Sequence, residues 1–66
     1  MIKVKLTEEH KQKLINNNCQ DHVNEFGDCI GILNKIEKNG DLEIIWLPSN
    51  LKYHYMCDAI QIVEII

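Results

Sequence analysis

The sequence predicts a mainly β protein, a small antiparallel barrel with an N-terminal strand and one short helix. An Asn39-Gly40 pair between two apolar stretches is the strongest short-range indication of a β-hairpin. Several other short runs alternate apolar and polar residues, as half-buried strands do. The chain has 66 residues, enough for one domain. Closing so many short strands into a barrel would remove exposed sheet edges, so we expect a barrel.

Residues 1–25 are expected to contribute a strand, a helix and a loop that pack on this barrel. Residues 2–6 alternate apolar side chains with lysines, which predicts a strand with one buried face. Thr7 offers a hydroxyl that can cap a helix running from Glu8 to about Asn17. Because this helix has a thin apolar side, we expect it to lie on a core formed by other residues. Residues 19–25 read as a loop.

Residues 26–66 are expected to form the barrel itself. The alternation of residue types predicts strands at residues 29–37, 42–47, 52–56 and 61–66, and a single helical turn at residues 58–60. Gly31 lies inside the first of these strands, which indicates a kink or a close approach by another part of the chain. Glu43 marks the outer side of the second strand, so Trp46 is expected to point inward.

Five segments of this region carry a resemblance to known proteins: residues 27–32, 39–40, 43–48, 51–55 and 58–63. They resemble small SH3-like barrel proteins of bacteriophages and prophages and, more distantly, the Mind bomb/HERC2 repeat. The resemblance covers about residues 26–66 and implies an SH3-like barrel. For the Mind bomb/HERC2 repeat it also implies binding to a protein partner. A weaker likeness, through Gly27-Asp28 and Gly31, is to the KOW motif of ribosomal and transcription proteins.

The composition argues against nucleic-acid and membrane partners. The net charge is −3, and the seven basic residues are all lysine. Arginine is the preferred side chain for bidentate contacts to phosphate and guanine, so its absence weakens a role in reading DNA or RNA. The longest apolar run, residues 44–47, is far too short to span a bilayer. With no recognisable signal peptide, we expect a cytoplasmic protein, in the host cytoplasm if it is phage-encoded.

Four apolar or aromatic residues are candidates for contact with a partner: Tyr53, Tyr55, Ile45 and Leu47. Tyr53 and Tyr55 share one face of a strand, where they could line a peptide groove or belong to the core. Ile45 and Leu47 share a face with Glu43, where they could form an exposed apolar patch and a homodimer seam. In the alternative, the N-terminal strand or helix covers them.

Two Cys/His pairs have the spacing of zinc ligands: Cys19 with His22, and His54 with Cys57. Residues three apart on a strand point to opposite faces, and neither pair has a glycine in its turn. The alternative interpretation is cysteines in the core or in loops beside surface histidines. We therefore expect no metal or other cofactor. A cysteine nucleophile would need a base and an orienting acid in a pocket. So small a core leaves little room for a pocket, so we expect that the protein is not an enzyme.

These observations together favour a non-catalytic module that binds another protein. A phage-encoded inhibitor of a host or defence protein is its most concrete form. One alternative is a nucleic-acid-associated barrel of the KOW type. The other is a structural subunit that associates with itself as a homodimer through Ile45 and Leu47.

Overall fold

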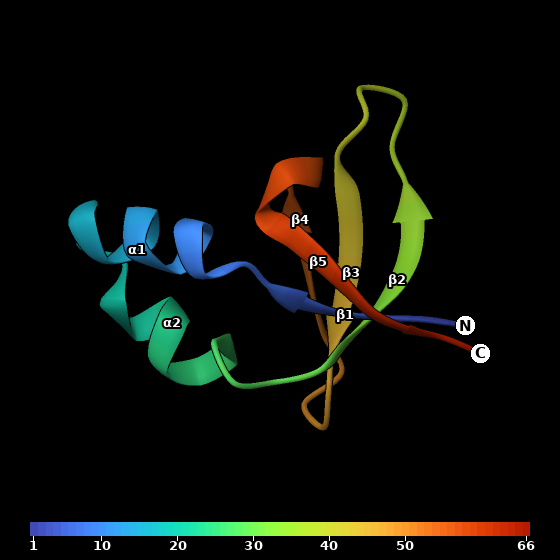
Figure 1. Cartoon of the computed structure of the whole chain (residues 1–66), viewed down its shortest axis with the longest axis horizontal. Helices are drawn as coiled ribbons and strands as arrows, with labels where there is room; N and C mark the ends of the chain where they lie inside the picture. Colours follow the sequence, from blue (N-terminus) through green and yellow to red (C-terminus); the bar gives the residue numbers. More distant parts are fainter.

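The computed structural model describes all 66 residues and shows a five-stranded antiparallel sheet accompanied by two helices (Figure 1). The strands are β1 (Ile2–Leu6), β2 (Gly31–Ile36), β3 (Leu42–Trp46), β4 (Leu51–Tyr55) and β5 (Ile60–Ile65). The helices are α1 (Glu8–Asn16) and α2 (Gln20–Phe26), and one turn of 3-10 helix, η1 (Cys57–Ala59), precedes β5. In Figure 1 both helices lie at one end of the molecule, and the two termini lie side by side at the other.

The sheet is open, which corrects the closed barrel that the sequence predicts. Its strand order is β4-β3-β2-β1-β5, so β4 and β5 are two free edges that do not pair with each other. Part of the core that a closing strand would cover is covered by α2, whose Phe26 stacks on Trp46 with ring centroids 5.7 Å apart. The protein is therefore a small mixed α/β domain. The N-terminal strand β1 lies inside this sheet, between β2 and β5.

The second helix is a further correction, since residues 19–25 read as a loop in the sequence. Helix α2 spans Gln20–Phe26 and buries only Phe26. It is short, and no side chain caps its first turn. Such a helix has weak local preference and is held by its packing on the sheet. The first helix follows the prediction closely, because Thr7 accepts a hydrogen bond from the His10 amide at 3.1 Å.

Alternating side chains of β1 and β3 fill the core, together with residues from α2, β4 and η1. The buried apolar residues are Val4, Leu6, Phe26, Ile44, Trp46, Tyr55 and Ala59. The predicted inward orientation of Trp46 is confirmed, since none of its surface is exposed. Gly31 faces this core. A Cβ atom there would lie 2.4 Å from Ile44 Cγ2 and 2.9 Å from Trp46 Cε3, so neighbouring side chains fill the space that any other residue would need.

The predicted hairpin is confirmed between β2 and β3. Gly40 has a φ of +92°, and the amide of Glu37 donates to the carbonyl of Asp41 at 2.8 Å. Three residues, 38–40, lie inside this bonded pair, and Gly40 supplies the left-handed backbone that the loop requires. Within the hairpin the register shifts between Leu33 and Lys35, so Asn34 is the extra residue of a β-bulge. The shift places Lys35 opposite Glu43.

Candidate functional site

The two tyrosines proposed for partner contact share a face of β4 but differ in exposure. Tyr55 retains only 7% of its surface and belongs to the core. Tyr53 retains 39%, although its ring packs against His22 and Phe26 of α2 with centroids 5.0 and 5.1 Å away. Helix α2 thus occupies the surface that a peptide groove over both tyrosines would need.

A chain of hydrogen bonds links α2 to the sheet through the Tyr55 hydroxyl. Trp46 Nε1–H donates to this oxygen at 2.9 Å, and His22 Nε2 lies 2.5 Å from it. Because the hydroxyl accepts from Trp46 and has one hydrogen to donate, we assign His22 Nε2 as the acceptor of that hydrogen, which corresponds to a neutral imidazole. Burial raises the pKa of Tyr55 to about 12 and lowers the pKa of His22, which favours the neutral form of both groups.

The other two proposed contact residues do not form a continuous apolar patch. Ile45 is half-buried on the outer face of the sheet, where Ile32 lies on one side and Lys52 on the other. Leu47 lies in the turn after β3 and is 37% exposed. Lysine beside Ile45 interrupts the apolar surface at this point, so neither a seam nor a groove is evident here.

The four proposed zinc ligands are not brought together. His22 turns toward Tyr55 on the core face, whereas His54 lies on the outer face of β4 and contacts Glu37 and Glu43. Side chains alternate along β4, so His54 lies on the opposite face of the sheet from its neighbour Tyr55, which His22 contacts. Cys19 and Cys57 are exposed free thiols outside any cluster of three or more potential ligands.

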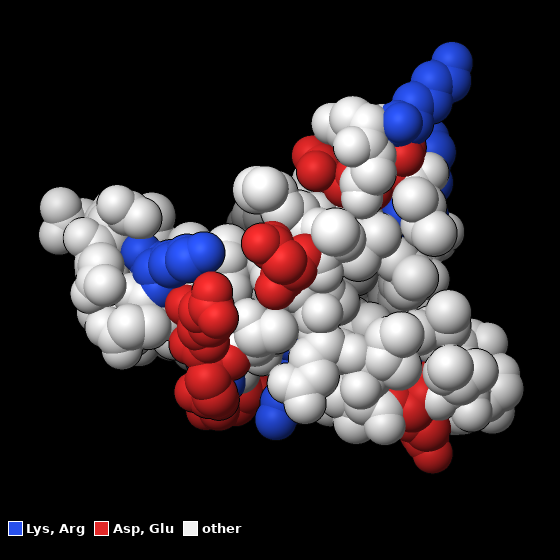
Figure 2. Space-filling view, turned by 45° about the horizontal axis from the view of Figure 1, so that its top comes forward, with Lys and Arg blue, Asp and Glu red and all other residues white.

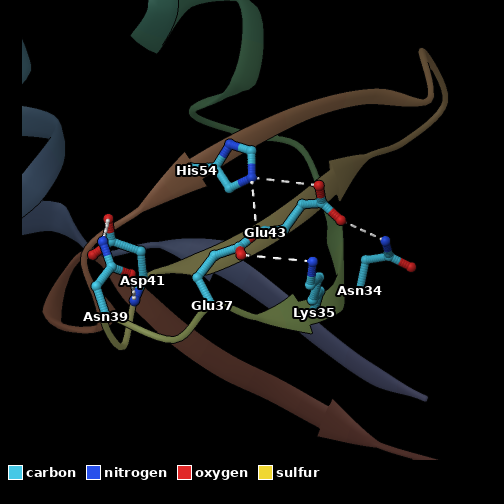
Figure 3. Close-up of polar contacts among 7 residues, drawn as sticks. All are labelled: Asn34, Lys35, Glu37, Asn39, Asp41, Glu43 and His54. Atoms are coloured by element: carbon cyan, nitrogen blue, oxygen red, sulfur yellow. Dashed lines mark hydrogen bonds and ion pairs between the residues drawn. The ribbon is translucent and has the colours of Figure 1, made fainter.

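His54 instead belongs to a polar cluster on the outer face, made by the ends of β2, β3 and β4 (Figure 3). His54 Nε2 lies 3.3 Å from Glu37 Oε1 and 3.4 Å from Glu43 Oε1. Asn34 Nδ2 donates to Glu43 Oε2 at 2.6 Å, and this hydrogen bond is the main cause of the lowered pKa of Glu43. We refer to His54, Glu37 and Glu43 as the outer cluster. Sequence spacing did not reveal it, because its residues come from three separate segments.

Several strongly exposed apolar residues lie near the chain termini. We call this group the terminal edge, and its residues are Met1, Ile62, Val63, Ile65 and Ile66. Ile62 is 57% exposed and Ile65 70% exposed. Both pair with core-facing residues of β1, since Ile62 lies opposite Val4 and Ile65 opposite Ile2. Ile62 and Ile65 therefore continue the core face that the open sheet leaves uncovered, whereas Met1 and Ile66 pair with each other and lie on the other face.

The backbone of β5 is also available at this edge. Met1 and Ile66 exchange two hydrogen bonds of 2.8 Å, which makes them a hydrogen-bonded pair and turns the backbone of Ile65 away from β1. At the other end of β5, Thr7 donates to Ala59. Hydrogen-bonded and non-hydrogen-bonded pairs alternate along two antiparallel strands, so counting from this bond turns the N–H and C=O groups of Ile62 away from β1 as well. Between them the register shifts, so Val63 is the extra residue of a bulge.

Charge distinguishes the two free edges of the sheet. Strand β5 has one charged residue, Glu64, which pairs with Lys3 at 3.3 Å. Strand β4 carries Lys52 and His54, and lysine on an edge discourages further strands from pairing there. In the view of Figure 2, the part of the molecule that bears the termini shows one acidic group and no lysine on the visible face. The terminal edge is thus the less protected of the two.

Neither a protein-family model, nor a curated protein, nor a solved structure matches this chain. None of its helices has the length and apolar character that crossing a membrane requires. The candidate site therefore rests on the geometry of the molecule itself. A sequence feature that could have indicated the terminal edge is the run from Ile62 to Ile66, which has a single charge among five residues.

Proposed function

We propose that this protein is a non-catalytic binding module that captures an extended segment of another protein along the terminal edge. The observation that carries the proposal is the outward backbone of Ile62 and Ile65 within an exposed apolar surface. Main-chain hydrogen bonds to an added strand supply affinity, and pockets for alternate side chains supply specificity. Clustered exposed apolar side chains often mark interaction sites in small soluble proteins.

The edge favours a different protein over a second copy as its occupant. In a β-bulge two residues of one strand face a single residue of the other, so a regular strand can pair with the bulged β5. Each copy of this chain carries a net charge of −3, so like charge opposes the association of two copies. We therefore assign the edge to an apolar, neutral or basic segment in the extended conformation.

The strand order and the 3-10 turn before β5 support a further proposal, that the fold is an open relative of the SH3-like barrels. On this reading the protein belongs with the small phage proteins that its sequence resembles, and its partner is a host or defence protein that it inhibits. The KOW-like alternative has less support. The chain has no arginine, and four lysines already pair with acids: Lys3, Lys11, Lys13 and Lys35.

A selection from a random peptide library tests the proposal. Peptides that bind the purified protein should be apolar and should shift the NMR amide resonances of β5 and β1. Ile65→Lys places a charge on the terminal edge and should weaken binding at least tenfold. Leu51→Lys, which places the same charge on the exposed face of β4, should leave the affinity unchanged.

Three outcomes count against this function. These are a library that yields no binder, resonance shifts that map to β4 or the helices, and an Ile65→Lys variant that binds peptide as well as the unaltered protein. Analytical ultracentrifugation of the free protein separates the self-associating alternative. A dimer that Ile65→Lys dissociates would assign the edge to a second copy and overturn the choice of partner.

A further inference from the structure

We propose that the outer cluster is a binding site for a divalent transition-metal ion, with Zn²⁺ as its representative ligand. The site lies on the outer face of the sheet and takes no part in the proposed strand capture. It differs from the Cys/His set considered from the sequence, of which it retains only His54. The three ligand atoms are one imidazole nitrogen and two carboxylate oxygens, and they lie within 4.8 Å of one another.

The separations of His54 Nε2 from the two carboxylate oxygens fit a metal ion. Zinc binds imidazole nitrogen and carboxylate oxygen at about 2.0–2.2 Å in tetrahedral geometry, which sets neighbouring ligand atoms roughly 3.3–3.5 Å apart. His54 Nε2 lies 3.3 Å from Glu37 Oε1 and 3.4 Å from Glu43 Oε1. An ion can therefore enter between these side chains with little movement of the strands. Water would complete its coordination.

The cluster is also prepared for the charge of an ion. Two carboxylates face one imidazole, and Asn34 holds the second oxygen of Glu43 at 2.6 Å. Such a partner orients a metal ligand and leaves its other oxygen free to coordinate. Mixed nitrogen and oxygen ligands suit zinc and its neighbours in the transition series, whereas Mg²⁺ prefers oxygen ligands and retains its water.

A protonated His54 paired with both glutamates would account for the same distances without a metal. The two interpretations differ in what the cluster does with Zn²⁺. If the cluster is only an ion pair, Zn²⁺ has no preferred position there. If it is a site, Zn²⁺ binds His54 Nε2, shifts the ring resonances of His54 and saturates at one ion per chain.

Calorimetric titration of the reduced full-length protein with Zn²⁺ alone tests the proposal, with the His54 ring followed by NMR. We expect saturation at one equivalent and a shift of the His54 resonances. His54→Ala and Glu43→Gln should each weaken binding at least tenfold. The matched controls are His10→Ala, which removes a histidine outside the cluster, and a Cys19→Ser/Cys57→Ser double variant, and both should bind as the unaltered protein does. Circular dichroism confirms that each variant is folded.

The absence of saturable binding would overturn the proposal. So would a Glu43→Gln variant that is folded and binds as tightly as the unaltered protein, or binding that the cysteine double variant loses and His54→Ala retains. The last test adds excess Mg²⁺ to the Zn²⁺-loaded protein and measures whether Zn²⁺ is released. Mg²⁺ should leave Zn²⁺ bound, and displacement would show a diffuse anionic surface rather than a site. Failure of this test leaves the peptide-binding experiment unaffected, because the two surfaces share no residue.

Discussion

At the scale of single residues, the Tyr55 hydroxyl joins the sheet to the helices. It accepts from Trp46 and donates to His22, so one oxygen satisfies polar groups on β3 and α2. A buried donor without a partner destabilises a fold by more than a formed hydrogen bond stabilises it. Removal of the Tyr55 hydroxyl oxygen therefore affects both strand β3 and helix α2.

We predict that Tyr55→Phe lowers the free energy of unfolding by about 1–3 kcal/mol, because Trp46 Nε1–H is left buried without an acceptor. Urea unfolding measures the change. Tyr53→Phe is the matched control, since the Tyr53 hydroxyl bonds no other side chain and its ring is 39% exposed. That control should change stability by less than about 0.5 kcal/mol. Equal effects from both variants would contradict the role given to the Tyr55 hydroxyl.

The neutral imidazole of His22 makes stability depend on pH. Burial lowers its pKa in the folded state below the usual value of 6.5, whereas the unfolded chain takes up a proton near that value. Below pH 6.5 the unfolded state therefore binds more protons, and the contribution of His22 to stability, complete above this pH, is lost as the pH falls.

We accordingly expect the free energy of unfolding to decrease between pH 7 and pH 5 by more in the unaltered protein than in His22→Gln. Glutamine keeps an acceptor for the Tyr55 hydroxyl but does not titrate in this range. Urea unfolding at a series of pH values measures the difference. Parallel pH profiles of the two proteins would mean that His22 is not held neutral in the fold.

At the scale of elements, strand β2 depends on a glycine that its neighbours require. Gly31 faces Ile44 and Trp46 so closely that a single methyl group overlaps both. We predict that Gly31→Ala destabilises the protein by about 1–3 kcal/mol through overpacking of the core. Thermal or urea unfolding tests this prediction. An unchanged unfolding midpoint would show that the core at this point is looser than the structure indicates.

The strands could be predicted from the sequence because alternation and turn residues are local features. Residues 2–6, the Asn39-Gly40 connection and the inward position of Trp46 all follow from them. The helix α2 could not be predicted in this way. Only Val23 and Phe26 repeat on one of its faces, and its stability comes from contacts with Trp46 and Tyr53, which lie far away in the sequence.

At the scale of the whole molecule, the open sheet is the feature that the sequence did not indicate. Closure depends on whether β4 and β5 meet, which is a relation between distant segments and not a local pattern. Helix α2 covers part of the core and leaves both edges free. The same open arrangement exposes Ile62 and Ile65, so the terminal edge was absent from the residues that sequence reasoning selected. Of the four proposed contact residues, Tyr55 is buried and Ile45 half-buried, whereas Tyr53 and Leu47 keep 39% and 37% of their surface exposed.

The outer cluster also depends on relations between distant segments. His54 was selected from the sequence for its spacing to Cys57, but in the structure it contacts Glu37 and Glu43 from neighbouring segments. The bulge at Asn34 sets the register that places Lys35 opposite Glu43, and Glu43 lies opposite His54. A one-residue shift would have turned these side chains to different faces. Register therefore decided which residues meet, and the sequence pattern did not specify it.

The most direct test of the account is amide hydrogen exchange on β5, with and without a peptide chosen from the library. The amides of Ile62 and Ile65 point outward, whereas the amide of Gln61 points toward β1 by the same alternation and serves as the internal control. We predict that the peptide slows exchange at Ile62 and Ile65 because a new strand accepts these hydrogens. Bound peptide with no added protection at either amide would contradict strand capture at the terminal edge.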